Sequence, residues 1–265
     1  MRGPAPRAAF ALALACGVGA GPARGADGDA QPAAASFPRG LVELKRQATA
    51  RGTPDETTRT QVKFDLFPQH AIVALLRLEL PFPDAKTDFS GSPFDPDFGD
   101  AKVRVGLRAV DIVGRATTSF LELTFPTADP PSQGSGKYQW SAGAKMAFAL
   151  AAAPAWMGAP RQGFSVQVQQ VGSFAGDGAR KDISQTKFEL EWRDTWPGGH
   201  YGKATAKPLI DWVGSGHTGA VLEIEGGWVI DRQWTLALMG GGLLWGEGVP
   251  GTYSKRLELK LAYRY

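Results

Sequence analysis

The last ten residues alternate between charged and apolar side chains until the chain ends on an aromatic residue. Successive side chains of a β-strand point to opposite faces. The apolar face carries Leu257, Leu259, Leu261, Tyr263 and Tyr265, and the charged face carries Arg256, Glu258, Lys260 and Arg264. A last strand with these two faces and a terminal aromatic is typical of outer-membrane β-barrels, in which one face meets lipid and the other meets the lumen.

The same period-two pattern recurs along the chain and predicts about eleven strands in all. The other segments lie at 62–66, 72–80, 102–109, 121–125, 138–148, 164–169, 187–193, 203–212, 222–230 and 233–238. Single-chain bacterial barrels have even strand counts. We therefore infer a twelfth strand near 41–49, where a periplasmic helix is the alternative. The expected fold is an all-β, transmembrane, antiparallel up-and-down barrel of about 12 strands.

The connections between these strands alternate in length. Long ones at 82–99 and 127–136 are expected outside, and short ones at 112–114 and 231–232 are expected inside. A soluble β-sandwich would also alternate. It is disfavoured because the apolar face is nearly continuous and would remain exposed unless a second sheet covered it.

The first 25 residues have the pattern of a signal peptide. Arg2 and Arg7 precede an apolar stretch, and Ala23-Arg24-Gly25 has the small residues of a cleavage site. Lipidation at Cys16 is the alternative. The chain therefore divides into a signal peptide (1–25), an unstructured segment (26–39) and the barrel (40–265).

Removal of this leader changes the charge of the protein. The whole chain has a formal charge of +3, and the leader holds Arg2, Arg7 and Arg24 without an acidic residue. The mature chain then carries no formal net charge, which gives no reason to expect nucleic-acid binding.

Five segments resemble the outer-membrane family named for the MetA pathway of phenol degradation. They are Phe98-Gly99-Asp100, Leu123-Thr124-Phe125-Pro126-Thr127-Ala128-Asp129, Gly134-Ser135-Gly136-Lys137-Tyr138-Gln139-Trp140, Ser173-Phe174-Ala175-Gly176-Asp177 and Lys207-Pro208-Leu209-Ile210. They occur in order from about residue 64 to the end of the chain. The resemblance implies an outer-membrane barrel, and it implies uptake of small, often aromatic or hydrophobic compounds.

The residues that could support catalysis are sparse. Ser215 and His217 lie in one expected outer loop, whereas His70 and His200 lie at expected inner turns. An i, i+2 pair on a glycine-flanked loop rarely presents a nucleophile and a base to each other, and spacing identifies no acidic residue to orient the base.

Two loop motifs have structural interpretations. Asp95, Asp97 and Asp100 lack the spacing of an EF-hand loop, and Gly134-Ser135-Gly136-Lys137 lacks the glycine spacing and the helix of a phosphate-binding loop. We expect no catalytic residue, no metal site and no cofactor.

The charged face of the strands is the more informative surface. The residues expected to line a constriction of the lumen are Lys102, Arg104, Glu189, Glu191, Arg193, Glu223 and Glu225. Basic and acidic side chains nearly balance on this face, which argues against strong ion selectivity. We also expect Gly240-Gly241-Gly242 to let neighbouring lumen side chains or strands approach closely.

These patterns predict a porin-like protein of the bacterial outer membrane. Small organic solutes, aromatic or hydrophobic ones among them, would enter between loops 82–99 and 127–136 and pass the charged lumen. A hydrophobic solute could instead leave laterally between strands. The expected partners are outer-membrane lipid, lipopolysaccharide and the barrel-assembly machinery, which would meet the C-terminal strand. The alternatives are a barrel enzyme that acts on envelope lipids and a non-conducting structural or adhesive barrel.

Overall fold

The computed structural model describes residues 39–50, 57–84, 97–112, 115–150, 161–213 and 216–265. The predicted signal peptide and Cys16 lie outside these residues. The strands are β1 (Gly40–Ala50), β2 (Thr57–Leu66), β3 (Val73–Pro83), β4 (Lys102–Leu107), β5 (Val110–Ile112), β6 (Arg115–Thr124), β7 (Lys137–Ala149), β8 (Arg161–Gly176), β9 (Ser184–Thr195), β10 (Tyr201–Asp211), β11 (His217–Val229), β12 (Trp234–Trp245) and β13 (Lys255–Arg264).

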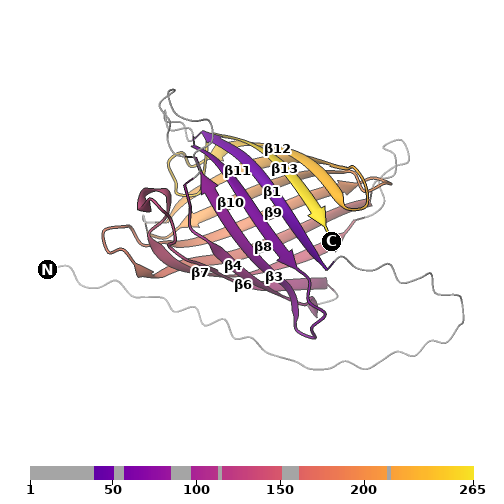
Figure 1. The fold of residues 1–265 in the computed structure, drawn as a ribbon, viewed down its shortest axis with the longest axis horizontal. Helices are drawn as coiled ribbons and strands as arrows, with labels where there is room; N and C mark the ends of the chain where they lie inside the picture. The colour runs from indigo at the N-terminus through magenta and orange to yellow at the C-terminus, as the bar shows by residue number, and fades with distance from the viewer. Residues whose placement is uncertain (1–38, 51–56, 85–96, 113–114, 151–160, 214–215) are drawn as a thin grey trace, which may run out of the picture. The chain divides into compact units, whose positions relative to one another are not determined.

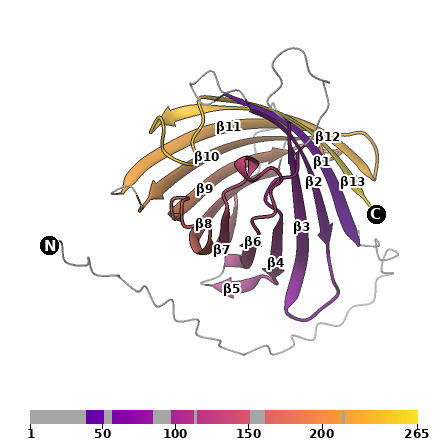
Figure 2. The same ribbon diagram turned by 60° about the vertical axis from the view of Figure 1, so that its left-hand side comes forward.

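The strands form one antiparallel sheet that closes on itself (Figures 1 and 2). β1 pairs with both β2 and the last strand, β13, and β4 pairs with both β3 and β6. The short β5 pairs with β6 and continues the line of β4 after a break at Arg108 and Ala109. Counting β4 and β5 as one interrupted strand, the barrel has twelve. This confirms the barrel predicted from the alternation, and the sandwich alternative is wrong.

β1 is the strand that the sequence indicates least clearly. Its pairing with β2 and β13 confirms the twelfth strand, so the helix alternative is wrong. The alternation is poor because Arg46 stands on the outward face. Its Nη1 atom donates hydrogen bonds to Asp84 Oδ1 at 2.8 Å and to Thr60 Oγ1 at 2.9 Å. A charged residue can occupy this outward position because it has these partners.

The break between β4 and β5 differs from the predicted alternation, which continues to Ala109. β4 ends at Leu107, and the next residue, Arg108, is exposed. The Arg108 side chain donates to the backbone carbonyls of Pro68 and His70 in the β2–β3 connection. Arg108 therefore ties a turn to the neighbouring strand and does not line the lumen.

The two faces of the sheet are reversed relative to a soluble protein. Leu257 is 57% exposed, whereas the next residue, Glu258, is 4% exposed. The same holds around the wall, where Ile224 is exposed and Glu225 is buried. Polar side chains therefore fill the interior and apolar side chains cover the outside. Within the described residues, no helix is long and apolar enough to cross a membrane.

Candidate functional site

The inward face of the barrel divides into two parts. The first, here called the paired wall, is formed by β10–β13 with β1–β3 and contains a dense network of ion pairs. The second, here called the polar wall, is formed by β4 and β6–β9 and carries amide and hydroxyl side chains with fewer ion pairs.

Glu225 is a carboxylate of the paired wall with three side-chain partners. It accepts a hydrogen bond of 2.6 Å from the Tyr201 hydroxyl, lies 3.0 Å from Lys260 Nζ and lies 3.2 Å from Lys203 Nζ. Tyr201 fits here because its ring lies over Gly227, where a Cβ atom would overlap it. Small residues thus make room for a buried hydrogen-bond network.

Glu223, two residues before Glu225 on β11, also has three side-chain partners. Lys207 Nζ lies 2.5 Å from it, and the Tyr253 hydroxyl donates a 2.5 Å hydrogen bond. Arg256 reaches Glu223 from β13 at 3.3 Å, across the intervening strand β12. Gly241 stands between them in register, and a Cβ there would lie 3.1 Å from Cγ of Glu223. Gly241 therefore allows the close approach that the glycine run predicts.

The remaining part of the paired wall is formed by β1, β2 and β3. Lys63 Nζ lies 2.7 Å from Glu43, and the Arg77 guanidinium donates two hydrogen bonds of 2.7 and 2.9 Å to Asp65. Lys45 lies 3.2 Å from Glu43. Buried charges are tolerated because each carboxylate has cationic partners.

The polar wall contains a cavity of about 200 Å³. Arg104 lies 2.6 Å from Glu122 at its edge, and Lys102 lies 3.6 Å from Glu79. The side chains that also line the cavity include Thr124, Gln139, Ser141, Gln169, Val171 and Lys187. Among the described residues that line it, the cavity therefore combines several cations and neutral donors with one acid, Glu122.

The seven residues predicted for the constriction all lie on strands at inward register positions, and they fall into separate groups. Lys102 and Arg104 border the cavity of the polar wall, whereas Glu223 and Glu225 belong to the paired wall. Of the three from β9, Glu191 and Arg193 have local contacts. Glu191 lies 3.5 Å from Lys145, Arg193 lies over the ring of Tyr201 at 4.0 Å, and Glu189 shares the inward face with both. That the seven form one constriction stays a prediction.

Sequence reasoning missed several inward residues. Tyr201 and Tyr253 bind the two glutamates of β11, and no spacing in the sequence indicates these contacts. Glu43 and Lys45 were missed because β1 alternates poorly. The inward position of Lys187 could have been predicted, since strand parity places it on the same face as Glu189.

The predicted balance of charge does not hold in the described strands. Basic side chains outnumber acidic ones at inward positions, because Lys45, Arg59, Lys137 and Lys187 join the basic set. Glu43 is the main addition to the acidic set. The interior thus has an excess of positive charge.

The two loops between which solutes were expected to enter are joined in their described parts. The backbones of Phe98 and Asp129 exchange hydrogen bonds of 3.0 and 2.8 Å. Asp100 accepts hydrogen bonds from the amide and the hydroxyl of Ser135 at 2.6 and 2.7 Å, and Asp97 accepts one from Gln133 at 2.9 Å. Entry of solutes between the two loops stays a prediction, since residues 85–96 of the first loop lie outside the described residues. Asp97 and Asp100 hold a loop together.

The histidines have local roles where the structure describes them. His70 Nδ1 accepts hydrogen bonds from the amides of Ile72 and Val73, and His200 Nδ1 accepts one from Val229. Ser215 and Asp95 lie outside the described residues. Within the described ranges, no group of His, Cys, Asp and Glu side chains is arranged to hold a metal ion.

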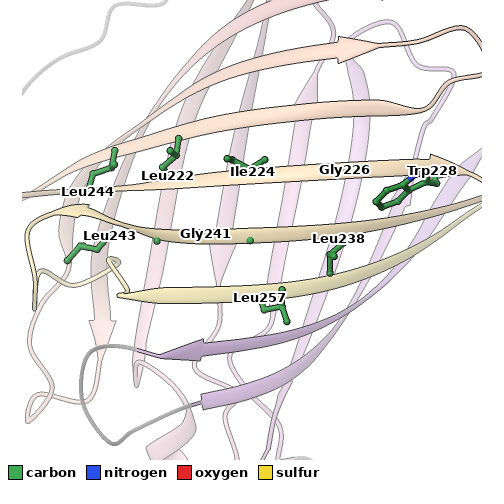
Figure 3. Close-up of a pocket in the computed structure, with 11 residues that line it drawn as sticks. Leu222, Ile224, Gly226, Trp228, Leu238, Gly241, Leu243, Leu244 and Leu257 are labelled. Carbon is green, nitrogen blue, oxygen red and sulfur yellow. The ribbon is translucent and has the colours of Figure 1, made fainter.

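An apolar groove of about 670 Å³ lies on the outward face of β11–β13 (Figure 3). Leu222, Ile224 and Leu257 line it, and Gly240 leaves its floor bare, with no heavy atom near the position of a Cβ. The β11–β12 and β12–β13 ladders beneath the groove are continuous apart from one bulge near Ala220. These ladders leave no lateral opening from the lumen at this place.

Comparison with solved structures places the fold among outer-membrane barrels. The COG4313 outer membrane channel from Pseudomonas putida F1 matches at a TM-score of 0.63 with 12% identity, over 89% of this chain and 100% of that chain. The NanC porin matches at 0.55 with 8% identity, over 85% and 98% of the two chains. The KdgM porin matches at 0.51 with 7% identity, over 85% and 99%.

At these identities the matches establish the architecture of the barrel. No protein-family model matches the chain, and no curated protein matches it.

Proposed function

We propose that this protein is an outer-membrane channel that gives small organic solutes passive passage through a charged lumen. The observation that carries the proposal is the reversal of the two faces in a closed barrel. Glu225 is 5% exposed inside, whereas its neighbour Ile224 is 62% exposed outside. Such a molecule is suited to a lipid surround and a hydrated interior.

The outer face supports a membrane location. It presents aromatic side chains near strand ends, as expected for residues at the lipid headgroups. Those exposed in the structure are Tyr138, Trp192, Trp212, Trp228, Trp245 and Tyr265. A soluble monomer rarely leaves an apolar surface of this extent uncovered. Lipid and lipopolysaccharide are the partners that we propose for this surface, after export directed by residues 1–25.

The kind of solute follows from the sequence resemblance and the fold together. Five segments resemble the phenol-degradation family of outer-membrane proteins, and the solved structures with the same fold are called a channel and porins. We propose membership of that family and passage of small organic molecules, aromatic compounds included. We also propose that the barrel-assembly machinery recognises the terminal strand β13.

The test is the conductance of the refolded mature protein in a planar lipid bilayer. Heat-modifiable migration on a gel first establishes that the barrel is folded. We expect discrete open steps whose size changes when Glu189 or Arg193 is neutralised. A folded barrel that gives no steps under any voltage would contradict the channel. That result would favour the structural or adhesive barrel, since the paired wall would then fill the lumen.

A further inference from the structure

Lys187 is a cation of the polar wall to which the described residues supply no counter-ion. It extends inward from β9 into the cavity of about 200 Å³. Within the described residues it has no hydrogen bond and no ion pair. Lys102 and Lys207 repel its charge, and Glu122 attracts it.

Glu122 does not neutralise Lys187, because Arg104 already uses it. Arg104 Nε donates a 2.7 Å hydrogen bond to Glu122 Oε2, and Nη2 of the same guanidinium lies 2.6 Å from that oxygen. Lys102 also borders the cavity, with Glu79 at 3.6 Å. The cavity therefore keeps a positive excess. A part-buried cation without a counter-ion is costly, and an anion that enters the cavity lowers this cost.

Neutral donors surround the same space. Gln169 Nε2 donates to Ser141 Oγ at 2.9 Å, which leaves the serine hydroxyl proton for another acceptor. Thr124 adds a second hydroxyl to the lining. A carboxylate has two oxygens and several lone pairs, so it can accept hydrogen bonds from an ammonium and a hydroxyl together.

The size of the cavity limits the ligand. Sites for drug-sized molecules occupy about 300–1,000 Å³, so 200 Å³ takes a molecule of only a few heavy atoms. The lining is predominantly polar, which favours a hydrophilic ligand over an aromatic one. We propose that this cavity, with Lys187 as its central charge, is a binding site for small hydrophilic carboxylates. The role of the site in transport rests on the proposed channel, whereas binding itself does not.

The experiment measures lactate binding to the refolded full-length mature chain in detergent micelles by saturation-transfer NMR. Lactamide serves as the neutral analogue of the same shape, and inorganic phosphate tests a general anion. We expect lactate to bind and lactamide not to bind. Lys187→Gln should weaken lactate binding at least tenfold, and Lys187→Arg should retain it. Equal binding of lactate and lactamide would overturn the proposal, and so would phosphate binding that excludes lactate.

Lys203→Gln is the matched control, since it removes the same charge from the paired wall, where Glu225 keeps Tyr201 and Lys260. It should leave lactate binding within twofold. If Lys187→Gln does not fold, Glu122→Gln replaces it, because loss of the one acid among the described lining residues should tighten lactate binding. Unchanged lactate binding in a folded Lys187→Gln variant, or in a folded Glu122→Gln variant, would contradict the site.

Conductance of the same preparations separates this inference from the proposed function. Lactate bound by a folded but silent barrel would leave the site standing and overturn the channel. Discrete conductance without any lactate binding would support the channel and overturn the carboxylate site.

Discussion

Gly40 and Tyr265 close the barrel by exchanging backbone hydrogen bonds. Each amide donates to the carbonyl of the other residue at 3.2 Å, and Arg39 adds a 2.7 Å hydrogen bond to the Tyr265 carbonyl. The Tyr265 ring occupies the place that a side chain at position 40 would need. The first described strand therefore begins with a residue that accommodates the last residue of the chain.

Gly40→Ala should destabilise the closed barrel. A Cβ at this position would overlap the ring of Tyr265 and approach the Asp65 carbonyl oxygen at 2.8 Å. Overpacking of this kind costs about 1–3 kcal/mol. Urea unfolding in micelles, followed by tryptophan fluorescence, measures the loss. Gly163→Ala is the control, because nothing lies within 4 Å of its Cβ position. Equal stability of the two variants would show that the closure tolerates a side chain.

Neighbouring glycines on β12 should respond differently to the same substitution. Gly241→Val places a side chain between Glu223 and Arg256 on the inward face, where a Cβ already meets the Tyr253 hydroxyl at 2.8 Å. We expect a loss of about 1–3 kcal/mol in the free energy of unfolding. Gly240→Val faces the open outer groove and should change stability by about 0.5 kcal/mol or less. The same urea titration compares them, and a larger loss in the Gly240 variant would refute the assigned faces.

The fold could be predicted from the sequence because one physical pattern governs it. Leu257 faces outward and its neighbour Glu258 faces the lumen, so apolar and charged residues alternate along each strand. The pattern fails where a tertiary contact changes the requirement. Arg46 faces outward because Asp84, distant in sequence, pairs with it, and the strand after Leu107 breaks where Arg108 binds the β2–β3 connection.

The candidate site was less predictable, since parity assigns a face but no partner. The ion pair of Glu225 with Lys260 joins strands that are not adjacent and runs diagonally across β12, where Met239 is opposite Glu225 and Ala237 is opposite Lys260. Strand parity places Lys187 on the inward face. Its lack of a counter-ion depends on Arg104 occupying Glu122, which only the three-dimensional arrangement reveals.

Removing the carboxylate at Glu225 should cost more than removing the one at Glu191. Glu225→Gln leaves Lys203 and Lys260 without their counter-charge in a poorly exposed place, and loss of one partner of a buried pair costs about 3 kcal/mol or more. Glu191 lies 3.5 Å from the more exposed Lys145, and pairs of that kind contribute about 0–1 kcal/mol.

The measurement is the urea midpoint of each folded variant, with Lys260→Met completing a double-mutant cycle for the Glu225 pair. The cycle isolates the interaction between the two side chains. A coupling free energy near zero would contradict a network centred on Glu225.

Acid should remove one contact that joins the β8–β9 connection to β7. Lys137 Nζ donates a 3.0 Å hydrogen bond to Asp182, which lowers the pKa of the Asp182 carboxyl from its ordinary 3.8. A carboxylate whose pKa is lower in the folded state stabilises that state above the unfolded pKa, and the effect is lost as pH falls through the folded pKa.

Asp182→Asn should therefore be less stable than the native chain at pH 7. The difference should begin to decrease as acid titration passes below pH 3.8 and should vanish below the lowered pKa of the folded state. Glu247→Gln, at an exposed loop position, is the control and should show no difference at either pH. A difference for Asp182→Asn that persists at pH 2 would mean that the contact does not depend on the charge of the carboxylate.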